Sequence, residues 1–97
     1  MENAIISSVF VGLEGHGIPT FSIGLRFESS AQSFGGYDLR YKDTAARFVE
    51  GMCRVTKCSN IYDTIGKVVR VDSTHHKIHR IGHPLRDVWF GTADMPT

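Results

Sequence analysis

The segment TFSIGLRFE, from Thr20 to Glu28, decides the fold class of this chain because its apolar and polar positions alternate without a break. Four apolar side chains fall on one face of an extended backbone: Phe21, Ile23, Leu25 and Phe27. A period of two residues predicts a half-buried antiparallel strand. Arg26 is the one basic residue of the first half of the chain and falls on the polar face, where a rigid strand would hold an anion-binding group.

The segments on either side of this strand predict two more strands. Ala4 to Leu13 is rich in β-branched and aromatic residues and predicts a strand with a weak point at Gly12. Glu14 to Gly17 contains two glycines among polar residues, which is typical of a hairpin loop. Ser29 to Leu39 predicts a third strand that contains a pair of glycines.

The middle of the chain predicts one long helix. Between Thr44, which follows Asp43, and Lys57, apolar residues recur at steps of three and four: Ala45, Phe48, Val49, Met52, Cys53 and Val55. This stripe is typical of a helix face that packs on a core. Asn60 is placed to cap a short helical turn that ends near Ile65.

The last third of the chain predicts three short extended segments: Val68 to Val71, Lys77 to Gly82 and Leu85 to Phe90. Asp72 to His76 reads as a polar turn, and the tail from Gly91 to Thr97 as frayed. Strict alternation puts Ile78 and Ile81 on opposite faces of their strand. Together these patterns predict a single α+β domain over residues 1–97, mainly an antiparallel sheet of about five or six strands with one long and one short helix.

Size and charge narrow the class of protein. A chain of 97 residues has a small core, and oligomerisation often adds to the stability of such a domain. No apolar run approaches the roughly 20 residues that a membrane span requires, so we expect a soluble intracellular protein. The net charge is +1, yet the part from Arg40 onward is basic and the part before it acidic. This distribution favours a local anion site, or a solvated basic surface, over a broad nucleic-acid-binding face.

Residues that could carry chemistry are few. Cys53 and Cys58 match no zinc or redox spacing, and both fall in the predicted helix, so we expect two reduced thiols. His75, His76 and His79 cluster, but no cysteine or carboxylate set completes a metal site. The chain also lacks a nucleophile elbow, a phosphate loop and paired carboxylates. We therefore expect no metal, no cofactor and no catalytic residues, and binding without turnover.

One stretch indicates a recognition surface, namely Gln32, Ser33, Phe34, Gly35, Gly36 and Tyr37. Paired glycines offer bare N–H groups and backbone conformations that a Cβ would forbid, and the aromatic residues beside them could stack on a planar ring. The stretch thus suggests binding of a planar anion such as a nucleotide. A bulge or turn whose aromatic side chains belong to the core fits the same residues.

A second candidate set is basic and aromatic: Arg80, His83, Arg86 and Trp89. Arginine binds phosphate with two parallel hydrogen bonds and stacks on bases. In an extended chain this spacing alternates faces, so not all four side chains converge within one chain, and some could meet across a two-fold interface. The alternative is a core tryptophan with exposed arginines.

Five motifs in this order resemble a family of small phage and prophage proteins: GLExHGIPT from Gly12 to Thr20, AQSFGGY from Ala31 to Tyr37, GKxVRV from Gly66 to Val71, IGH from Ile81 to His83, and DxWF from Asp87 to Phe90. Within that family the chain resembles the first described group of anti-Thoeris proteins, which act as sponges for cyclic ADP-ribose isomers. The resemblance covers the chain from Val9 to Phe90. The connection before the helix is shorter than is typical of the family, and the segment between Val71 and Ile78 is irregular.

The resemblance implies a viral anti-defence protein, active in the cytoplasm of the infected bacterial host. Such a protein binds and sequesters a cyclic nucleotide immune signal, in some members a cyclic oligonucleotide, without cleaving it. It forms homodimers or higher homo-oligomers with ligand at subunit interfaces, and no membrane or stable nucleic-acid complex is expected. The chemistry suggests a phosphate site at Gly35, Gly36 and Arg26 beside Gln32. It also suggests a pyrophosphate site at Arg80, His83 and Arg86, and stacking by Phe34, Tyr37 or Trp89.

Two other functions fit the same sequence. A phage inhibitor could dock directly on a host defence protein, such as a CRISPR effector, with its basic residues competing for nucleic acid. A plain structural interaction module is the third interpretation. Binding of a nucleotide would separate the first hypothesis from both.

Overall fold

The computed structural model describes residues 1–74 and 77–95 of the chain. The described elements are β1 (Glu2–Leu13), β2 (Pro19–Arg26), β3 (Ala31–Asp38), α1 (Thr44–Thr56), the 3-10 turn η1 (Ile61–Thr64), β4 (Val68–Thr74), β5 (Lys77–Gly82), β6 (Trp89–Gly91) and the 3-10 turn η2 (Thr92–Asp94). The predicted α+β class is confirmed.

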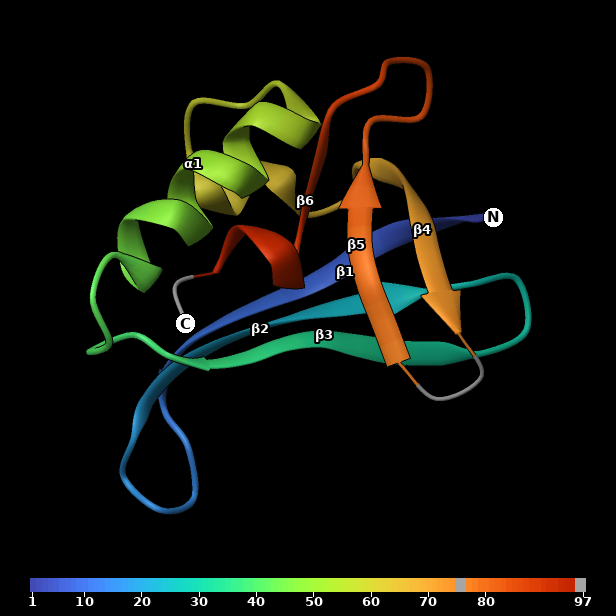
Figure 1. Ribbon diagram of the computed structural model, residues 1–97. Helices are drawn as coiled ribbons and strands as arrows, with labels where there is room; N and C mark the ends of the chain where they lie inside the picture. The colour runs from blue at the N-terminus through green and yellow to red at the C-terminus, as the bar shows by residue number, and fades with distance from the viewer. Residues whose placement is uncertain (75–76, 96–97) are drawn as a thin grey trace.

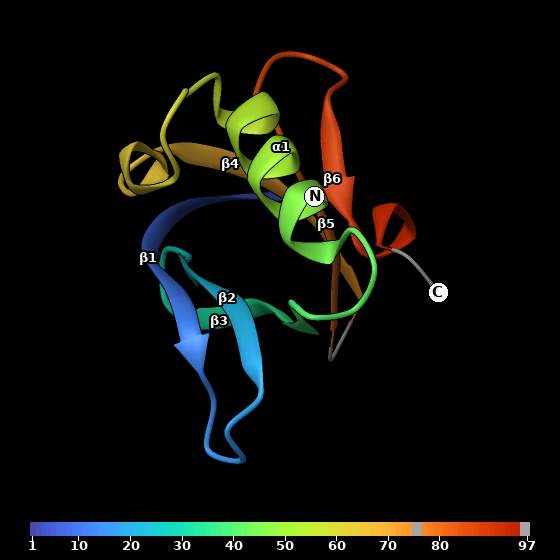
Figure 2. The same cartoon turned by 90° about the vertical axis from the view of Figure 1, so that its left-hand side faces the viewer.

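The strands form one antiparallel sheet in the order β3-β2-β1-β4-β5-β6. The long strand β1 joins the two halves of this sheet. Its first residues, Glu2 to Ile5, pair with β4, whereas Ile5 to Leu13 pair with β2. Because the sheet curves, both halves wrap around α1, which covers the inner face (Figures 1 and 2).

The core lies between α1 and the inner face of the sheet. Phe21, Ile23 and Leu25 of β2 are completely buried, as their alternation predicts. The ring of Phe21 stacks on Phe48 of α1 with a centroid separation of 3.8 Å. Met52, one turn farther along α1, is also completely buried. Phe48, Met52 and Val55 of the predicted helix stripe are thus buried, whereas its members Ala45 and Val49 are exposed.

Bulges interrupt the alternation of inward and outward side chains in β5 and β1. Asp72 pairs with Arg80 and the next residue of β4 pairs with Ile78, so His79 has no partner across the ladder. The extra residue brings Ile78 and Ile81 to the same side, and both are buried. In β1 a similar shift at Ser7 follows Ile6. An inserted residue is not visible in a two-residue sequence period. The prediction that Ile78 and Ile81 lie on opposite faces was therefore wrong.

The C-terminal third differs from the prediction at several boundaries. The last strand covers only Trp89 to Gly91, and the tail that was expected to fray forms η2, where a carboxylate oxygen of Asp94 accepts a hydrogen bond from the Gly91 N–H at 2.8 Å. β4 continues through Thr74 into the predicted turn, and the rest of that turn, with its two neighbouring histidines, lies outside the described residues.

The end of α1 also differs from the prediction. The helix ends at Thr56, and Lys57 adopts a left-handed conformation with φ of 58°. Cys58 therefore lies beyond the helix, and Cys53 lies within it. Both cysteines are free thiols, as expected. Within residues 1–74 and 77–95, none of the helices is long and apolar enough to cross a membrane.

Candidate ligand-binding groove

The paired glycines of β3 form a bulge. Phe21 pairs with Tyr37 and the next residue of β2 pairs with Gly35, so Gly36 is the inserted residue. Gly35 and Gly36 have φ of 126° and 86°, a region that residues with a Cβ rarely adopt. A Cβ on Gly35 would also lie 2.8 Å from the carbonyl oxygen of Phe21. These positions thus require glycine for the backbone itself.

The aromatic residues beside this bulge belong to the core. Phe34 is 3% exposed and packs edge-on against Phe90, with ring centroids 5.9 Å apart. Tyr37 is half-buried and packs on Phe21 at 5.6 Å. Of the three aromatic residues considered for stacking on a ligand, Phe34 is corrected, because its ring is buried and packs against Phe90.

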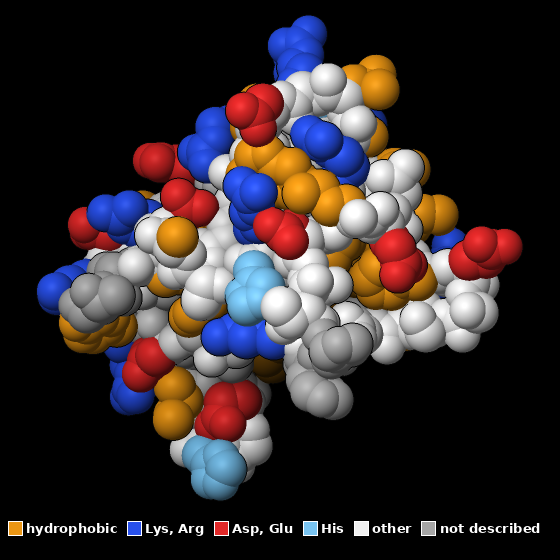
Figure 3. All heavy atoms as spheres, turned by 45° about the vertical axis from the view of Figure 1, so that its right-hand side comes forward, with side chains coloured by type: hydrophobic (Ala, Val, Ile, Leu, Met, Phe, Trp, Pro, Cys, Tyr) orange, Lys and Arg blue, Asp and Glu red, His pale blue; other side chains and the backbone are white. Residues whose placement is uncertain are grey.

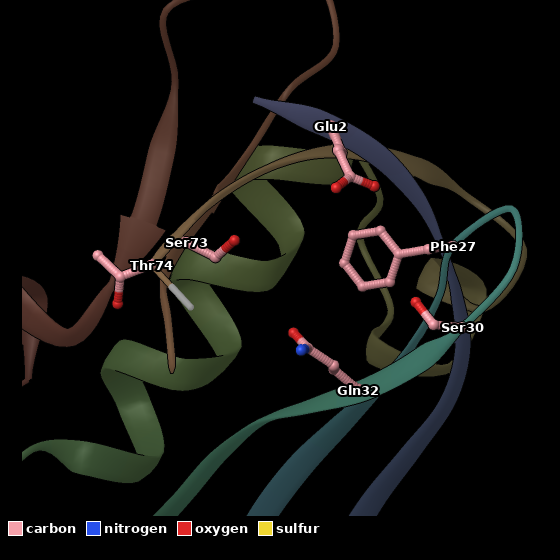
Figure 4. Close-up of a pocket in the computed structure, with 6 residues that line it drawn as sticks. All are labelled: Glu2, Phe27, Ser30, Gln32, Ser73 and Thr74. Atoms are coloured by element: carbon pink, nitrogen blue, oxygen red, sulfur yellow. The ribbon is translucent and has the colours of Figure 1, made fainter. Parts of the chain in front are cut away.

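Gln32 nevertheless lies at a hollow in the surface. A cavity of about 450 Å³ is lined by Glu2, Phe27, Ser30, Gln32, Ser73 and Thr74, and Figure 4 shows these side chains around it. An adjoining cavity of about 320 Å³ is lined by Gln32, Ser33, Phe34, Gly35, Tyr37, Lys77 and Ile78. Gln32 belongs to both. We call the two together the β3 groove.

The fold brings the walls of the β3 groove together from distant parts of the sequence. The turn after β2, closed by a hydrogen bond of 2.8 Å from the Phe27 N–H to the Ser30 carbonyl oxygen, presents the ring of Phe27. Gln32 projects from β3, and Ser73 lies across the cavity at the end of β4 (Figure 4). Lys77, at the start of β5, lines the adjoining cavity.

The β3 groove offers hydrogen-bonding groups that are not already engaged. Within the described part of the chain, the side chains of Ser30, Gln32 and Ser73 make no hydrogen bond, whereas the Thr74 hydroxyl pairs with a nitrogen of His79 at 3.2 Å. An amide and two hydroxyls supply both donors and acceptors. With the ring of Phe27 beside them, they are suited to a planar, polar molecule.

Arg26 lies at a different hollow. A cavity of about 470 Å³ on the other side of Phe27 is lined by Asn3, Ala4, Ile5, Arg26, Phe27, Glu28 and Val68. The Arg26 side chain is exposed and makes no ion pair or hydrogen bond with any described residue. Anion binding by Arg26 stays a prediction, and the structure does not place this side chain beside the paired glycines. Phe27 lies between the two cavities and lines both.

The C-terminal candidates form a second cluster, in which Arg80 and Trp89 are in contact. The guanidinium carbon of Arg80 lies 4.1 Å from the centroid of the Trp89 ring, and its Nε donates to a carboxylate oxygen of Asp72 at 2.8 Å. Because β5 and β6 form a hairpin, the two side chains share a face of the sheet within one chain. Convergence of this pair therefore needs no second copy, and the expectation that not all four candidates converge within one chain concerned the full set.

Arg70 completes this cluster, and sequence reasoning did not single it out as a site residue. Its guanidinium carbon lies 4.6 Å from the Trp89 ring centroid. Its Nε donates to the His83 carbonyl oxygen at 2.8 Å and its Nη2 to that of Arg86 at 2.7 Å. Arg70 thus holds the loop between β5 and β6.

The cluster around Trp89 is arranged for structure more than for phosphate. Arg80 is neutralised by Asp72, and the His83 ring accepts hydrogen bonds at Nδ1 from the backbone N–H groups of Leu85 and Arg86 at 3.1 and 3.2 Å. A cavity of about 360 Å³ lies next to this cluster and is lined by Asp72, His79, Arg80, Trp89, Gly91, Thr92, Ala93 and Asp94. Two of these residues, Asp72 and Asp94, carry carboxylates. Carboxylates disfavour a bound phosphate.

Two observations on the described residues concern metal binding and thiol chemistry. In the described ranges, no group of three or more His, Cys, Asp and Glu side chains could hold a metal ion. Burial raises the pKa of the Cys53 thiol, which disfavours the thiolate that a nucleophile needs.

Figure 3 shows Lys and Arg side chains interspersed with Asp and Glu on the face that it presents, without a patch of one sign.

Comparison of the chain with protein-family models, with curated proteins and with solved structures found no match.

Proposed function

We propose that this protein is a phage-encoded anti-defence protein that binds and sequesters a cyclic nucleotide immune signal without cleaving it. The signal would be a cyclic ADP-ribose isomer or a related cyclic nucleotide in the infected bacterial cell. The observation that carries the proposal is the β3 groove, where the side chains of Ser30, Gln32 and Ser73, which have no hydrogen-bond partner among the described residues, surround the ring of Phe27. The resemblance of five sequence motifs to phage sponges of such signals supports the same function.

The β3 groove has the size and chemistry for a nucleoside. Its two cavities, of about 450 and 320 Å³, fall within the roughly 300–1,000 Å³ typical of small-molecule sites. A base stacked on Phe27 would gain about 1–3 kcal/mol. Gln32 would pair with the base edge, and the Glu2 carboxylate would accept hydrogen bonds from ribose hydroxyls. Lys77 lines the second cavity and would supply the cation for a phosphate held there.

Self-association belongs to this proposal because two arginines, Arg86 and Arg26, lie away from the groove of their own chain and could contact a ligand bound to a second copy. Neither side chain forms an ion pair with a described residue. Arg86 follows the end of β5, whereas Lys77 begins it. A strand of this length spans roughly 17–20 Å, so Arg86 would reach a phosphate in the groove only from a second copy. Arg26 lines the cavity beyond Phe27 and is the other candidate for such a contact.

Calorimetric titration with cyclic ADP-ribose isomers and with cyclic di- and trinucleotides tests the proposal. We expect one of these to bind and to be recovered chemically intact after the protein is heat-denatured. Gln32→Ala should weaken the binding at least about tenfold, which corresponds to about 1.4 kcal/mol. Glu50→Ala, a change at another exposed residue on α1, is the control and should leave the affinity unchanged.

Two results would contradict the proposal. Release of a cleaved product would show an enzyme in place of a sponge. Absence of binding across the whole panel would favour an inhibitor that docks directly on a host defence protein.

A further inference from the structure

The cavity of about 470 Å³ beside Arg26 lies where β2 ends and the first residues of β1 continue without it. The last pair of the ladder between these two strands joins Ile5 to Arg26. On the other side of β1, Val68 of β4 is paired with Ile5. Side chains directly opposite each other in a ladder share a face of the sheet, so these three residues form one row across three strands. We call this cavity the Arg26 pocket.

The Arg26 pocket has an apolar floor on the face of the sheet that points away from the core. Ala4 and Ile6 point into the core and are 3% and 0% exposed, so Ile5 between them points to the opposite face. Val68 beside it is 43% exposed, and Phe27 also lines the pocket. An apolar group bound here would remove this floor from water together with its own surface, which favours binding.

Two charges of opposite sign line the Arg26 pocket. The guanidinium of Arg26 and the carboxylate of Glu28 are both exposed, and neither forms an ion pair or a hydrogen bond with a described residue. Asp38 and Arg40 stand at the same spacing in the sequence and form an ion pair at 3.0 Å. The pocket therefore offers a cation and an anion that do not neutralise each other.

The backbone of Asn3 adds a donor and an acceptor to the Arg26 pocket. Ile6 is hydrogen-bonded on the β4 side of β1, with Lys67 at 3.0 Å and Gly66 at 2.7 Å. Backbone groups of successive residues point to opposite edges of a strand, so those of Ile5 and of Asn3 point to the β2 side. β2 has ended at the level of Asn3, and no backbone group of a described residue pairs with it there.

We propose that the Arg26 pocket binds an α-amino acid with a large apolar side chain. The carboxylate of the ligand accepts two parallel hydrogen bonds from the guanidinium of Arg26, and its ammonium group pairs with the carboxylate of Glu28. The ligand side chain lies on Ile5, Val68 and Phe27. The volume of about 470 Å³ is within the range of roughly 300–1,000 Å³ for small-molecule sites and favours a large side chain.

A zwitterion fits these charges better than a ligand of one sign. A plain carboxylate or phosphate would pair with Arg26 but would also meet the carboxylate of Glu28, which repels it. An amine without a carboxylate would attract Glu28 and repel Arg26. An amino acid carries both charges on one carbon atom and leaves its side chain for the apolar floor.

NMR titration of the nucleotide-free protein with L-phenylalanine tests this inference. We expect a Kd of about 1 mM or tighter, with shifts of the amide signals of Asn3 and Ile5. N-acetyl-L-phenylalanine lacks the ammonium group, and L-phenylalaninamide lacks the carboxylate. Each derivative should bind at least about tenfold more weakly than L-phenylalanine.

Two variants link each charge of the ligand to its partner in the pocket. Arg26→Gln should bind L-phenylalanine at least about tenfold more weakly and should no longer distinguish it from L-phenylalaninamide. Glu28→Gln should behave in the same way toward N-acetyl-L-phenylalanine. Glu50→Gln removes another exposed carboxylate, on α1, and as the matched control should bind like the wild type.

Three results would each overturn the inference. They are absence of wild-type binding up to about 10 mM L-phenylalanine, equal affinity for either derivative, and unchanged affinity of Arg26→Gln or Glu28→Gln. Because no nucleotide is present, each of these results is distinguishable from failure of the proposed function.

Discussion

Replacing Arg70 by methionine should destabilise the protein more than any other exchange of a surface arginine discussed above. The side chain is half-buried and holds the loop between β5 and β6 through the carbonyl oxygens of His83 and Arg86, at 2.8 and 2.7 Å. It also lies against the ring of Trp89. Methionine keeps most of the apolar stem of the arginine but none of these polar contacts.

The expected loss follows from these contacts. A hydrogen bond from a charged donor contributes about 1.5–3 kcal/mol, and the lower end applies here because the contact with Arg86 is solvent-exposed. A cation–π contact near the surface adds about 0.5–1 kcal/mol. With an allowance for water that replaces part of the lost bonding, we expect a loss of roughly 2–3 kcal/mol. For a domain of this size each kcal/mol lowers Tm by about 4–8 °C.

Chemical denaturation monitored by Trp89 fluorescence measures this loss, and Arg26→Met is the matched control. Arg26 makes no side-chain contact of this kind within the described residues, so its exchange should cost at most about 0.5 kcal/mol. Arg70→Lys, which keeps the charge and one donor, should fall between the two. If Arg70→Met and Arg26→Met were equally stable, the assignment of a structural role to Arg70 would be wrong.

Two smaller predictions concern the core and the first hairpin. A Cβ on Gly51 would collide with the ring of Phe90. In Gly51→Ala this overpacking should cost about 1–3 kcal/mol of the free energy of unfolding, which should exceed the gain of about 1 kcal/mol from the higher helix propensity of alanine. Urea denaturation should show Gly51→Ala as less stable and Gly15→Ala, which meets nothing within 4 Å, as unchanged; a stabilised Gly51→Ala would contradict the packing. A hydrogen bond from the Ile18 N–H lowers the pKa of Glu14. The ionised Glu14 side chain therefore stabilises the hairpin fully above the pKa that Glu14 has in the unfolded chain. This stabilisation is lost as the pH falls through the lower pKa of Glu14 in the folded protein. NMR titration should find Glu14 below the ordinary pKa of a glutamate, and Glu14→Gln should abolish the pH dependence of the Ile18 amide shift; an ordinary or higher pKa would refute this contact.

The parts of the fold that follow local patterns could be predicted from the sequence. The alternation around Ile23 and the stripe containing Phe48 each reflect burial of one face, which depends on spacing within a single element. Asn60 caps the short helical turn as predicted, accepting a hydrogen bond from the Tyr62 N–H at 2.9 Å. These elements needed no information from distant residues.

The predictions that failed concern parts of the fold that depend on contacts between distant segments. The short strand or extended segment expected from Leu85 to Phe90 is a strand only from Trp89, and the loop before it is held by hydrogen bonds from Arg70 of β4. The bulge at His79 leaves no local signal in a strand of ordinary composition. A pattern within one segment cannot anticipate a hydrogen bond supplied by another.

The candidate site shows the same division. Paired glycines predicted the bulge at Gly36, and the alternative in which the adjacent aromatic side chains belong to the core proved correct for Phe34. The β3 groove itself was not predicted, because it exists only where the curved sheet brings Ser73 toward Gln32. Phe27 was read as a core residue from its alternation, and it does pack on the core while also lining the groove.

Thermal melting in the presence of cyclic ADP-ribose isomers tests the central claim most directly. At a ligand concentration of about 100 times Kd, binding to the folded state alone adds about 2.7 kcal/mol. That gain should raise Tm by roughly 11–22 °C. At the same ligand concentration a tenfold loss of affinity in Gln32→Ala should reduce the gain to about 1.4 kcal/mol, which roughly halves the rise, whereas Glu50→Ala should keep the full rise. A flat response of the wild type to every cyclic nucleotide, or an equal rise in Gln32→Ala, would contradict the assignment of the β3 groove as the binding site.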